Sequence, residues 1–144
     1  MISHQRCKIL SRSLLILTAC SFLLALIAAG CAPKNSPRGV VDRFIDAYYV
    51  QIDLKNAEQF TAGLALDKIR KEEQLTAGQT IDSSTRKPVV HYRLKNERIE
   101  SEHATYLFLA RIDVPDGGSF DRNWMISARK EGPDWKVSSF SEDE

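Results

Sequence analysis

Histidine is the side chain best suited to acid–base catalysis near neutral pH, because its ordinary pKa lies close to that pH. Beyond residue 30 the chain has two histidines, His91 and His103. A catalytic base also needs a second group that orients it, and the sequence places no carboxylate within reach of either histidine. We therefore expect both to be surface or structural residues, and we expect no turnover that depends on His91.

Other catalytic patterns are missing from the sequence. Asp42 and Asp46 are four residues apart and share a helix face, but that face is offset from the apolar stripe, so solvation is the simpler interpretation. The chain has no metal-ligand spacing, no glycine-rich phosphate loop and no recognisable Ser/His/Asp set. We predict no catalytic residue, no metal site and no cofactor.

Aromatic side chains with a polar tip are candidates for binding. They are common in ligand pockets and still more common as core filling in a small domain. We expect Trp135 to fill the core. Trp124 and Arg111 fall on neighbouring predicted strands and are the first pair to consider for a pocket. The candidate pocket residues are His91, Tyr106, Arg111 and Trp124.

The elements that position these side chains begin, in chain order, with three predicted helices. Ser36 is a suitable N-cap, and a helical stripe predicts a helix over residues 37–51: Val40, Val41, Phe44, Ile45, Tyr48 and Ile52. Asp53 can cap a second helix with one apolar face, made by Ala57, Phe60 and Leu64. Gly63 is expected to break it, and a third, shorter helix follows to about residue 74. Its charged run DKIRKEEQ is expected to be a solvated face.

After residue 88 apolar and polar side chains alternate with a period of two, which predicts four antiparallel strands. Both faces of the second are apolar at residues 107–109, which predicts a central strand covered on both sides. Replacing Leu107 by Ala should then cost about 2–5 kcal/mol. We expect seven side chains to be mostly buried: Phe44, Tyr48, Phe60, Leu107, Phe108, Ile126 and Trp135. The predicted fold class is α+β, with two or three N-terminal helices packed on an antiparallel sheet of about four strands.

The first thirty residues have the pattern of an export signal. Residues 13–30 contain no charged side chain, and Arg6, Lys8 and Arg12 precede them. Removing these three of the 20 basic residues leaves 17 against 19 acidic ones, so the mature chain is mildly acidic. No basic cluster stands out, which excludes nucleic acid as a partner.

The four residues AAGC, ending at Cys31, resemble the lipobox of bacterial lipoproteins, whose cysteine is lipid-modified and becomes the new N-terminus. The resemblance implies a signal peptide over residues 1–30, a lipidated Cys31 with a tether over residues 31–37, and a domain over residues 38–144. Two or three lipid chains would anchor the protein stably in a membrane of the cell envelope. Because Ala32 follows the cysteine, the resemblance implies the outer membrane if the cell is Gram-negative.

Two alternatives to this anchor stay open. Cys20 follows the residues LTA, which fit the lipobox well, but the apolar run before it is short. Residues 13–30 are also just long enough for an uncleaved transmembrane anchor.

The domain resembles the nuclear transport factor 2-like superfamily. The resemblance covers residues 37–140 and rests on the opening helix VVDRFIDAYY and on a last strand with Gly132, Trp135, Lys136, Val137 and Phe140 in the form G-x-x-W-K-V-S-S-F. It implies a curved sheet wrapped around the first helix, which forms a cone with a pocket at its open end. Unlike many members, the chain has no strand predicted between the second and third helices.

Three functional hypotheses follow from this resemblance, because some members are isomerase-like or dehydratase-like enzymes and many others have no known activity. The leading one is a non-catalytic, membrane-anchored envelope lipoprotein that binds a protein partner or a small ligand. The second is a small-pocket isomerase or dehydratase with His91 as base, which a buried His91 beside a carboxylate would favour. The third is a structural envelope-assembly module, which a large exposed apolar patch would favour.

Overall fold

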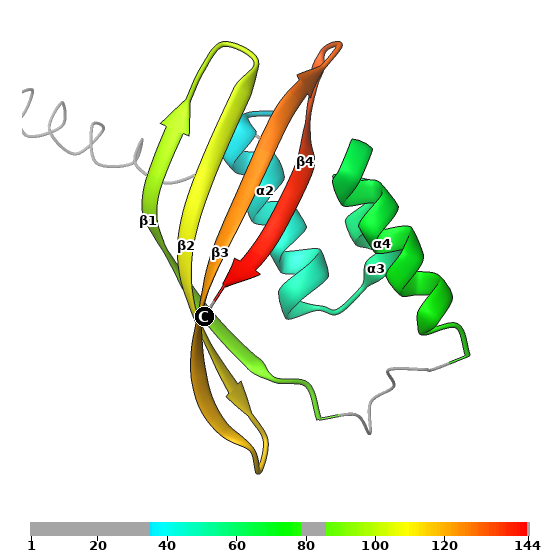
Figure 1. Cartoon of the computed structure of the whole chain (residues 1–144), viewed down its shortest axis with the longest axis vertical. Helices are drawn as coiled ribbons and strands as arrows, with labels where there is room; N and C mark the ends of the chain where they lie inside the picture. The colour runs from blue at the N-terminus through cyan, green and yellow to red at the C-terminus, as the bar shows by residue number, and fades with distance from the viewer. Residues whose placement is uncertain (1–34, 79–85, 144) are drawn as a thin grey trace, which may run out of the picture. The chain divides into compact units, whose positions relative to one another are not determined.

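The computed structural model describes residues 35–78 and 86–143 (Figure 1). The predicted signal peptide, Cys20 and Cys31 lie outside the described residues and stay predictions. The helical elements are α2 (Pro37–Ile45), a π-helix (Asp46–Val50), α3 (Leu54–Glu58) and α4 (Gly63–Leu75). The strands are β1 (Val89–Ile99), β2 (His103–Val114), β3 (Gly118–Glu131) and β4 (Asp134–Asp143). No helix in these two stretches is long and apolar enough to cross a membrane.

The helix predicted over residues 37–51 is confirmed. It starts where the Ser36 side chain accepts a hydrogen bond from Gly39 N at 3.0 Å, which satisfies one of the free N–H groups of the first turn. Four members of its apolar stripe are fully buried, namely Val40, Val41, Phe44 and Ile45, whereas Tyr48 and Ile52 are partly buried. The position of this stripe determines which side of the helix meets the sheet.

The end of this helix is widened into the π-helix, in which hydrogen bonds run from residue i to residue i−5. Gln51 N accordingly donates to Asp46 O at 2.8 Å. Ile52 then has a φ of 55°, the left-handed conformation that glycine usually adopts just after a helix. Asp53 N closes the turn by donating to Ala47 O at 2.8 Å. A β-branched residue in this conformation is strained by about 1–3 kcal/mol.

Two shorter helices complete the helical layer. Asp53 caps α3, because its side chain accepts a hydrogen bond from Asn56 N at 2.9 Å. Gly63, expected to break a helix, begins α4 with a φ of 55°. Leu64 therefore belongs to α4, where it is 75% exposed, and its predicted place on the buried face of the second helix is wrong.

The four strands form one antiparallel sheet in the order β1-β2-β3-β4. Figure 1 shows the helices on one face of this curved sheet. The side chains of the two central strands that face the helices are buried: Ala104, Tyr106, Phe108 and Ala110 from β2, and Trp124, Ile126 and Ala128 from β3. The prediction of an α+β fold, with helices followed by an antiparallel sheet, is confirmed.

The segment between α3 and α4 is fixed to the edge strand β4. Ala62 N donates to Val137 O at 2.9 Å, and Val137 N donates to Phe60 O at 2.8 Å. Thr61 thereby forms an isolated parallel bridge with Val137, where the sequence predicted no strand. The register of β4 against β3 shifts next to this bridge, at Ser138, and such a bulge bends a strand. Backbone hydrogen bonds therefore hold the start of α4 beside the sheet.

The prediction that β2 is covered on both faces is wrong. Leu107 lies on the outer face, opposite Met125 of β3, and is only partly buried. The described helices pack against the other face, so among the described residues Leu107 is sheltered only by its neighbours in the sheet. Of the remaining six residues expected to be buried, three are fully buried, namely Phe44, Phe108 and Ile126. The other three pack against the core and are partly exposed: Tyr48, Phe60 and Trp135.

We expect Phe108→Ala to lower the free energy of unfolding by about 3–5 kcal/mol, because it leaves a cavity in the core. Leu107→Ala, at the next position of the same strand, should lower it by less than about 2 kcal/mol, because Leu107 loses less buried surface. Urea denaturation followed by far-UV circular dichroism measures both values. Equal losses for the two variants would contradict the one-sided burial of β2.

We expect Ile52→Gly to be more stable than Ile52→Ala by about 1 kcal/mol, because alanine keeps the strain of the left-handed conformation and glycine does not. The matched control is Gln51, whose φ is −84°, where the alanine variant should be the more stable of the pair. The same denaturation assay ranks the four variants. Equal stability of Ile52→Gly and Ile52→Ala would show that the turn is unstrained.

Candidate functional site

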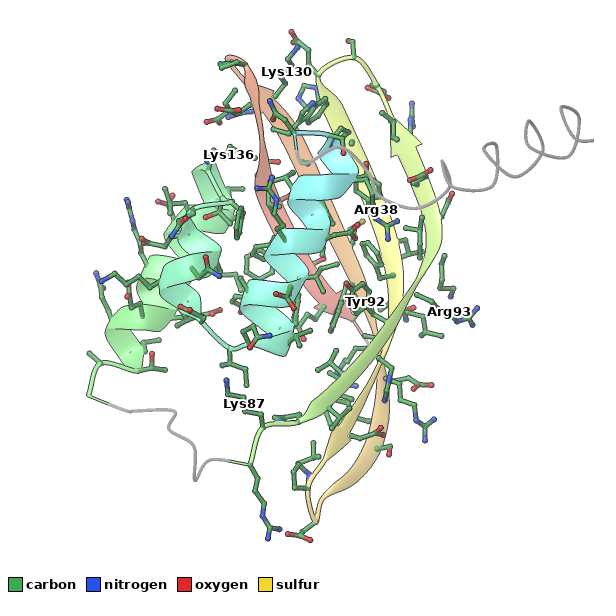
Figure 2. The ribbon with its side chains drawn as sticks, turned by 180° about the vertical axis from the view of Figure 1, so that it is seen from behind. Arg38, Lys87, Tyr92, Arg93, Lys130 and Lys136 are labelled. Atoms are coloured by element: carbon green, nitrogen blue, oxygen red, sulfur yellow. The ribbon has the colours of Figure 1, made fainter. Side chains whose placement is uncertain are left out.

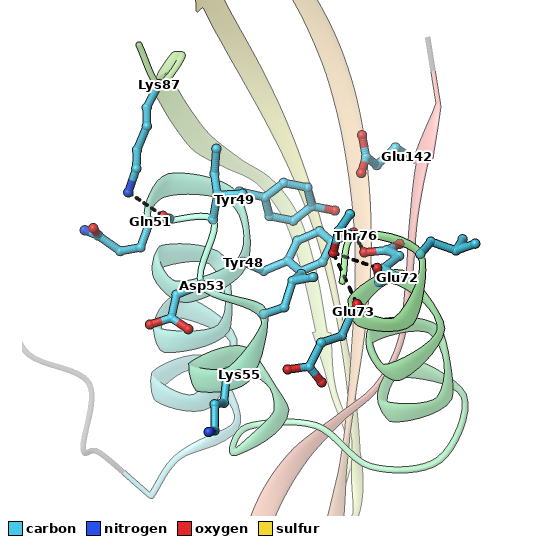
Figure 3. Close-up of a pocket in the computed structure, with 13 residues that line it drawn as sticks. Tyr48, Tyr49, Gln51, Asp53, Lys55, Glu72, Glu73, Thr76, Lys87 and Glu142 are labelled. Carbon is cyan, nitrogen blue, oxygen red and sulfur yellow. Dashed lines mark hydrogen bonds between the residues drawn. The ribbon is translucent and has the colours of Figure 1, made fainter. Parts of the chain in front are cut away.

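A cavity of about 910 Å³ opens between the π-helix, the C-terminal end of α4 and the end of β4 (Figure 3). This volume lies within the range of small-molecule sites. Segments that are distant in the sequence contribute its lining: Tyr48, Tyr49, Gln51, Ile52, Asp53, Leu54, Lys55, Glu72, Glu73, Leu75, Thr76, Lys87 and Glu142.

Two adjacent tyrosines of the π-helix give the cavity an aromatic floor. The Tyr49 ring stacks on the Trp124 indole of β3, with 3.8 Å between the ring centroids. The Tyr48 ring lies 4.8 Å from the Phe140 ring of β4 and 5.4 Å from the Phe44 ring of α2. Adjacent side chains of an α-helix point about 100° apart. The extra residue in the π-turn changes the angle between adjacent side chains, and it does so where the Tyr48 and Tyr49 rings both contact the sheet.

The two phenol groups differ in their hydrogen bonding. Tyr48 Oη donates to Glu72 Oε2 at 2.7 Å, so one wall of the cavity is tied to its floor. Tyr49 Oη is buried and lies close to the Glu142 carboxylate, but it forms no hydrogen bond of ordinary geometry with any residue that the structure describes. Burial raises the pKa of both phenols, and the nearby charges of Glu72 and Glu142 raise them further. Both tyrosines therefore stay neutral at physiological pH.

The charged groups of the cavity are mostly acidic, with four carboxylates against two lysines. Glu72, Glu73 and Glu142 form no ion pair with any described residue. Lys87 Nζ donates to the carbonyl of Gln51 at 2.7 Å. Within residues 35–78 and 86–143, no three His, Cys, Asp or Glu side chains are grouped so that they could hold a metal ion.

Two of the four predicted pocket residues, His91 and Arg111, lie on the outer face of the sheet. They are paired across β1 and β2, their side chains are 68% and 60% exposed, and they line a shallow groove of about 300 Å³. His91 Nε2 lies 3.8 Å from Asp113 Oδ2, beyond hydrogen-bond distance. Arg111 is close to both Asp113 and Asp121. An exposed imidazole without a hydrogen-bonded carboxylate lacks the fixed orientation that a general base needs.

The other two predicted pocket residues, Tyr106 and Trp124, lie on the helix-facing side and are fully buried. Burial raises the pKa of Tyr106 to about 12. Trp124 lies beneath the ring of Tyr49 and does not line the cavity itself. The four residues are therefore divided between two faces of the sheet, and the structure does not bring them together in one pocket.

The residues that line the cavity were mostly missed by the sequence analysis. Glu72 falls in the charged run that was interpreted as a solvated face, yet it is partly buried and accepts the Tyr48 hydrogen bond. One usable signal was the pair of adjacent tyrosines, because Tyr49 falls outside the stripe that includes Tyr48. Glu142 had no comparable signal, since its place depends on the register of β4 after the bulge.

No protein-family model matches the chain, and no curated protein matches it. Solved structures do match. A protein from Thiobacillus denitrificans, described as a calcium/calmodulin-dependent protein kinase type II association domain, gives a TM-score of 0.56 at 12% identity and covers 74% of this chain and 93% of its own. A SEC-C motif containing protein from Rhodopseudomonas palustris gives 0.53 at 16% identity, covering 78% of this chain and 83% of its own.

A designed protein with a long sheet gives a TM-score of 0.49 at 12% identity and covers 75% of this chain and 100% of its own. At such low identities a structural match shows the fold alone. The association domain has a nuclear transport factor 2-like fold, and its match to this chain supports the same fold here.

Proposed function

We propose that this protein is a bacterial envelope lipoprotein whose domain binds a small molecule in the 910 Å³ cavity and performs no chemistry on it. The cavity is the observation that carries the proposal. It combines an aromatic floor with a few polar groups that converge from three elements, which is the usual composition of a ligand site. The match to nuclear transport factor 2-like structures is consistent with a binding module.

The non-catalytic part of the proposal rests on the side chains available for proton transfer. His91 and His103 are both exposed and lie outside the cavity. The two tyrosines in the cavity have raised pKa values, so neither supplies a base near neutral pH. The isomerase or dehydratase hypothesis named His91 as its base, and His91 is exposed on the outer face of the sheet, away from this cavity.

A small ligand is favoured over a role in envelope assembly by the distribution of exposed apolar side chains. Among the described residues the large exposed ones are spread over three elements: Leu64 and Leu75 on α4, Val89, Tyr92 and Ile99 on β1, and Phe120 and Met125 on β3. Scattered single apolar residues are normal on a protein surface, whereas a partner interface needs a contiguous patch.

The location is proposed from the sequence. Lipid on Cys31 would hold the domain at a membrane of the envelope, facing the periplasm or the cell exterior, and in a Gram-negative cell the membrane would be the outer one. A binding domain at that position meets molecules that enter or leave the cell.

Ligand binding can be tested with the full-length protein purified in a non-ionic detergent and dialysed against a small-molecule extract of bacterial envelopes. We expect mass spectrometry to find at least one retained compound, and Thr76→Trp to reduce its retention at least tenfold, because the indole fills the mouth of the cavity. Gln74→Trp is the matched control, since Gln74 is exposed two residues before Thr76, in the last turn of α4, and does not line the cavity. Equal retention by both variants, or none by the unmodified protein, would contradict the proposal.

The anchor can be tested by metabolic labelling with a radioactive fatty acid. We expect Cys31→Ser to abolish labelling and to leave an uncut precursor, because the acylated thiol is lost. Cys20→Ser should label and mature normally. Labelling that persists in Cys31→Ser and disappears in Cys20→Ser would move the lipid to Cys20.

A further inference from the structure

We propose that the cavity takes an organic cation, specifically an aliphatic diamine or polyamine. This inference rests on the proposed function, since it names the chemistry of the molecule bound at the same site. Four properties of the lining carry it: the charge of its walls, the aromatic floor, the spread of its carboxylates, and its apolar side chains.

The charge of the walls selects for a cation. Glu72 and Glu73 reach the cavity from α4, and Glu142 reaches it from β4. Glu72 is partly buried, Glu73 and Glu142 are exposed, and none of the three forms an ion pair with a described residue. Charges of one sign that line the same concave surface produce a negative potential over it. Figure 3 shows Glu72 and Glu142 beside the tyrosines, with Lys55 and Lys87 at other margins of the cavity.

The aromatic floor has the chemistry that favours an ammonium group, because the face of an aromatic ring attracts a cation. The same cluster already contacts one ammonium group of the protein itself. Lys68 Nζ lies 4.1 Å from the centroid of the Phe140 ring, which packs against Tyr48. Lys68 is one helical turn before Glu72 but forms no ion pair with it, so the charge of that carboxylate, which accepts only the neutral Tyr48 hydroxyl, remains available to a ligand.

The spread of the carboxylates favours an extended molecule over a metal ion. In the described part of the chain, no three acidic side chains are grouped so that they could ligate one ion. A molecule with two or more ammonium groups can instead meet carboxylates on α4 and β4 separately. The side chains of Ile52, Leu54 and Leu75 also line the cavity and suit an aliphatic body between the charged ends.

An anion fits this cavity poorly. The cations that the lining offers it are Lys55, which is exposed, and Lys87, whose ammonium group already donates to the Gln51 carbonyl at 2.7 Å. An anion would also lie in the field of four carboxylates, and like charges repel strongly where water is partly excluded.

Three ligands of equal length test the proposal on the full-length protein in non-ionic detergent: hexane-1,6-diamine, hexane-1,6-diol and adipate. Isothermal titration calorimetry at low salt should show the diamine binding at least tenfold more tightly than the diol or adipate. A tenfold change corresponds to about 1.4 kcal/mol. Raising the ionic strength should weaken diamine binding, because salt screens the carboxylates.

Glu72→Gln and Glu142→Gln should each weaken diamine binding at least tenfold, since each removes one charge and keeps the shape of the side chain. Glu102→Gln is the matched control, because Glu102 is exposed at the turn between β1 and β2 and does not line the cavity. Its affinity for the diamine should equal that of the unmodified protein. Thermal melts of each variant separate lost binding from lost folding.

Each other outcome overturns the inference in a recognisable way. If the diol or adipate binds as tightly as the diamine and Thr76→Trp blocks it, the ligand class is wrong and the proposed function stands. If none of the three binds while the dialysis assay still retains a compound, the amine assignment fails alone. Diamine binding that is unaffected by Glu72→Gln and Glu142→Gln would place the amine outside this cavity.

Discussion

The stack of the Tyr49 ring on the Trp124 indole is the contact on which the cavity depends. Trp124 is fully buried in the middle of the sheet, so its indole has no room to move aside. The two stacked rings therefore set the distance between the sheet and the end of the first helix. Nearer its start the same helix approaches the sheet through smaller side chains, such as Val40 and Val41. Since a curved sheet diverges from a helix that crosses it, space remains at the open end, and the two tyrosines form its floor.

The walls of the cavity follow from how the chain leaves that helix. The turn at Ile52 and the hydrogen bond from Asp53 N to Ala47 O direct the chain into α3. The bridge between Thr61 and Val137 then attaches the start of α4 to β4. With both ends of this segment fixed, Glu72 on α4 lies where the Tyr48 hydroxyl can donate to it. The geometry of the site is thus set by backbone hydrogen bonds outside it.

The fold could be predicted from local patterns, and the site could not, for a physical reason. The stripe from Val40 to Ile45 and the alternation from Ala104 to Ala110 record burial against one neighbouring layer, and burial is a property that the sequence carries residue by residue. At residues 107–109 both faces of β2 are apolar, and apolar character alone does not tell whether a second layer covers a face. Leu107 was therefore expected in the core although it lies on the outer face.

The same limit explains why the candidate pocket was divided between two faces. His91 and Arg111 were grouped with Tyr106 and Trp124 because all four fall on neighbouring strands, but residues one position out of phase point to opposite sides. The cavity itself joins a π-helix, the end of α4 and a strand that follows a bulge. A π-turn and a bulge each shift the phase by one residue, and no periodicity in this sequence marks either of them.

Two departures from the most stable arrangement coincide at this cavity. Ile52 has a strained conformation, and Tyr49 Oη is buried without a hydrogen bond of ordinary geometry to any described residue. Each costs free energy, and the buried stripe of the first helix and the core side chains of the sheet must offset the total. A molecule that binds only the folded state recovers part of this cost by mass action. The concentration of such costs at one site, rather than their spread over the domain, is what a site built for a ligand is expected to show.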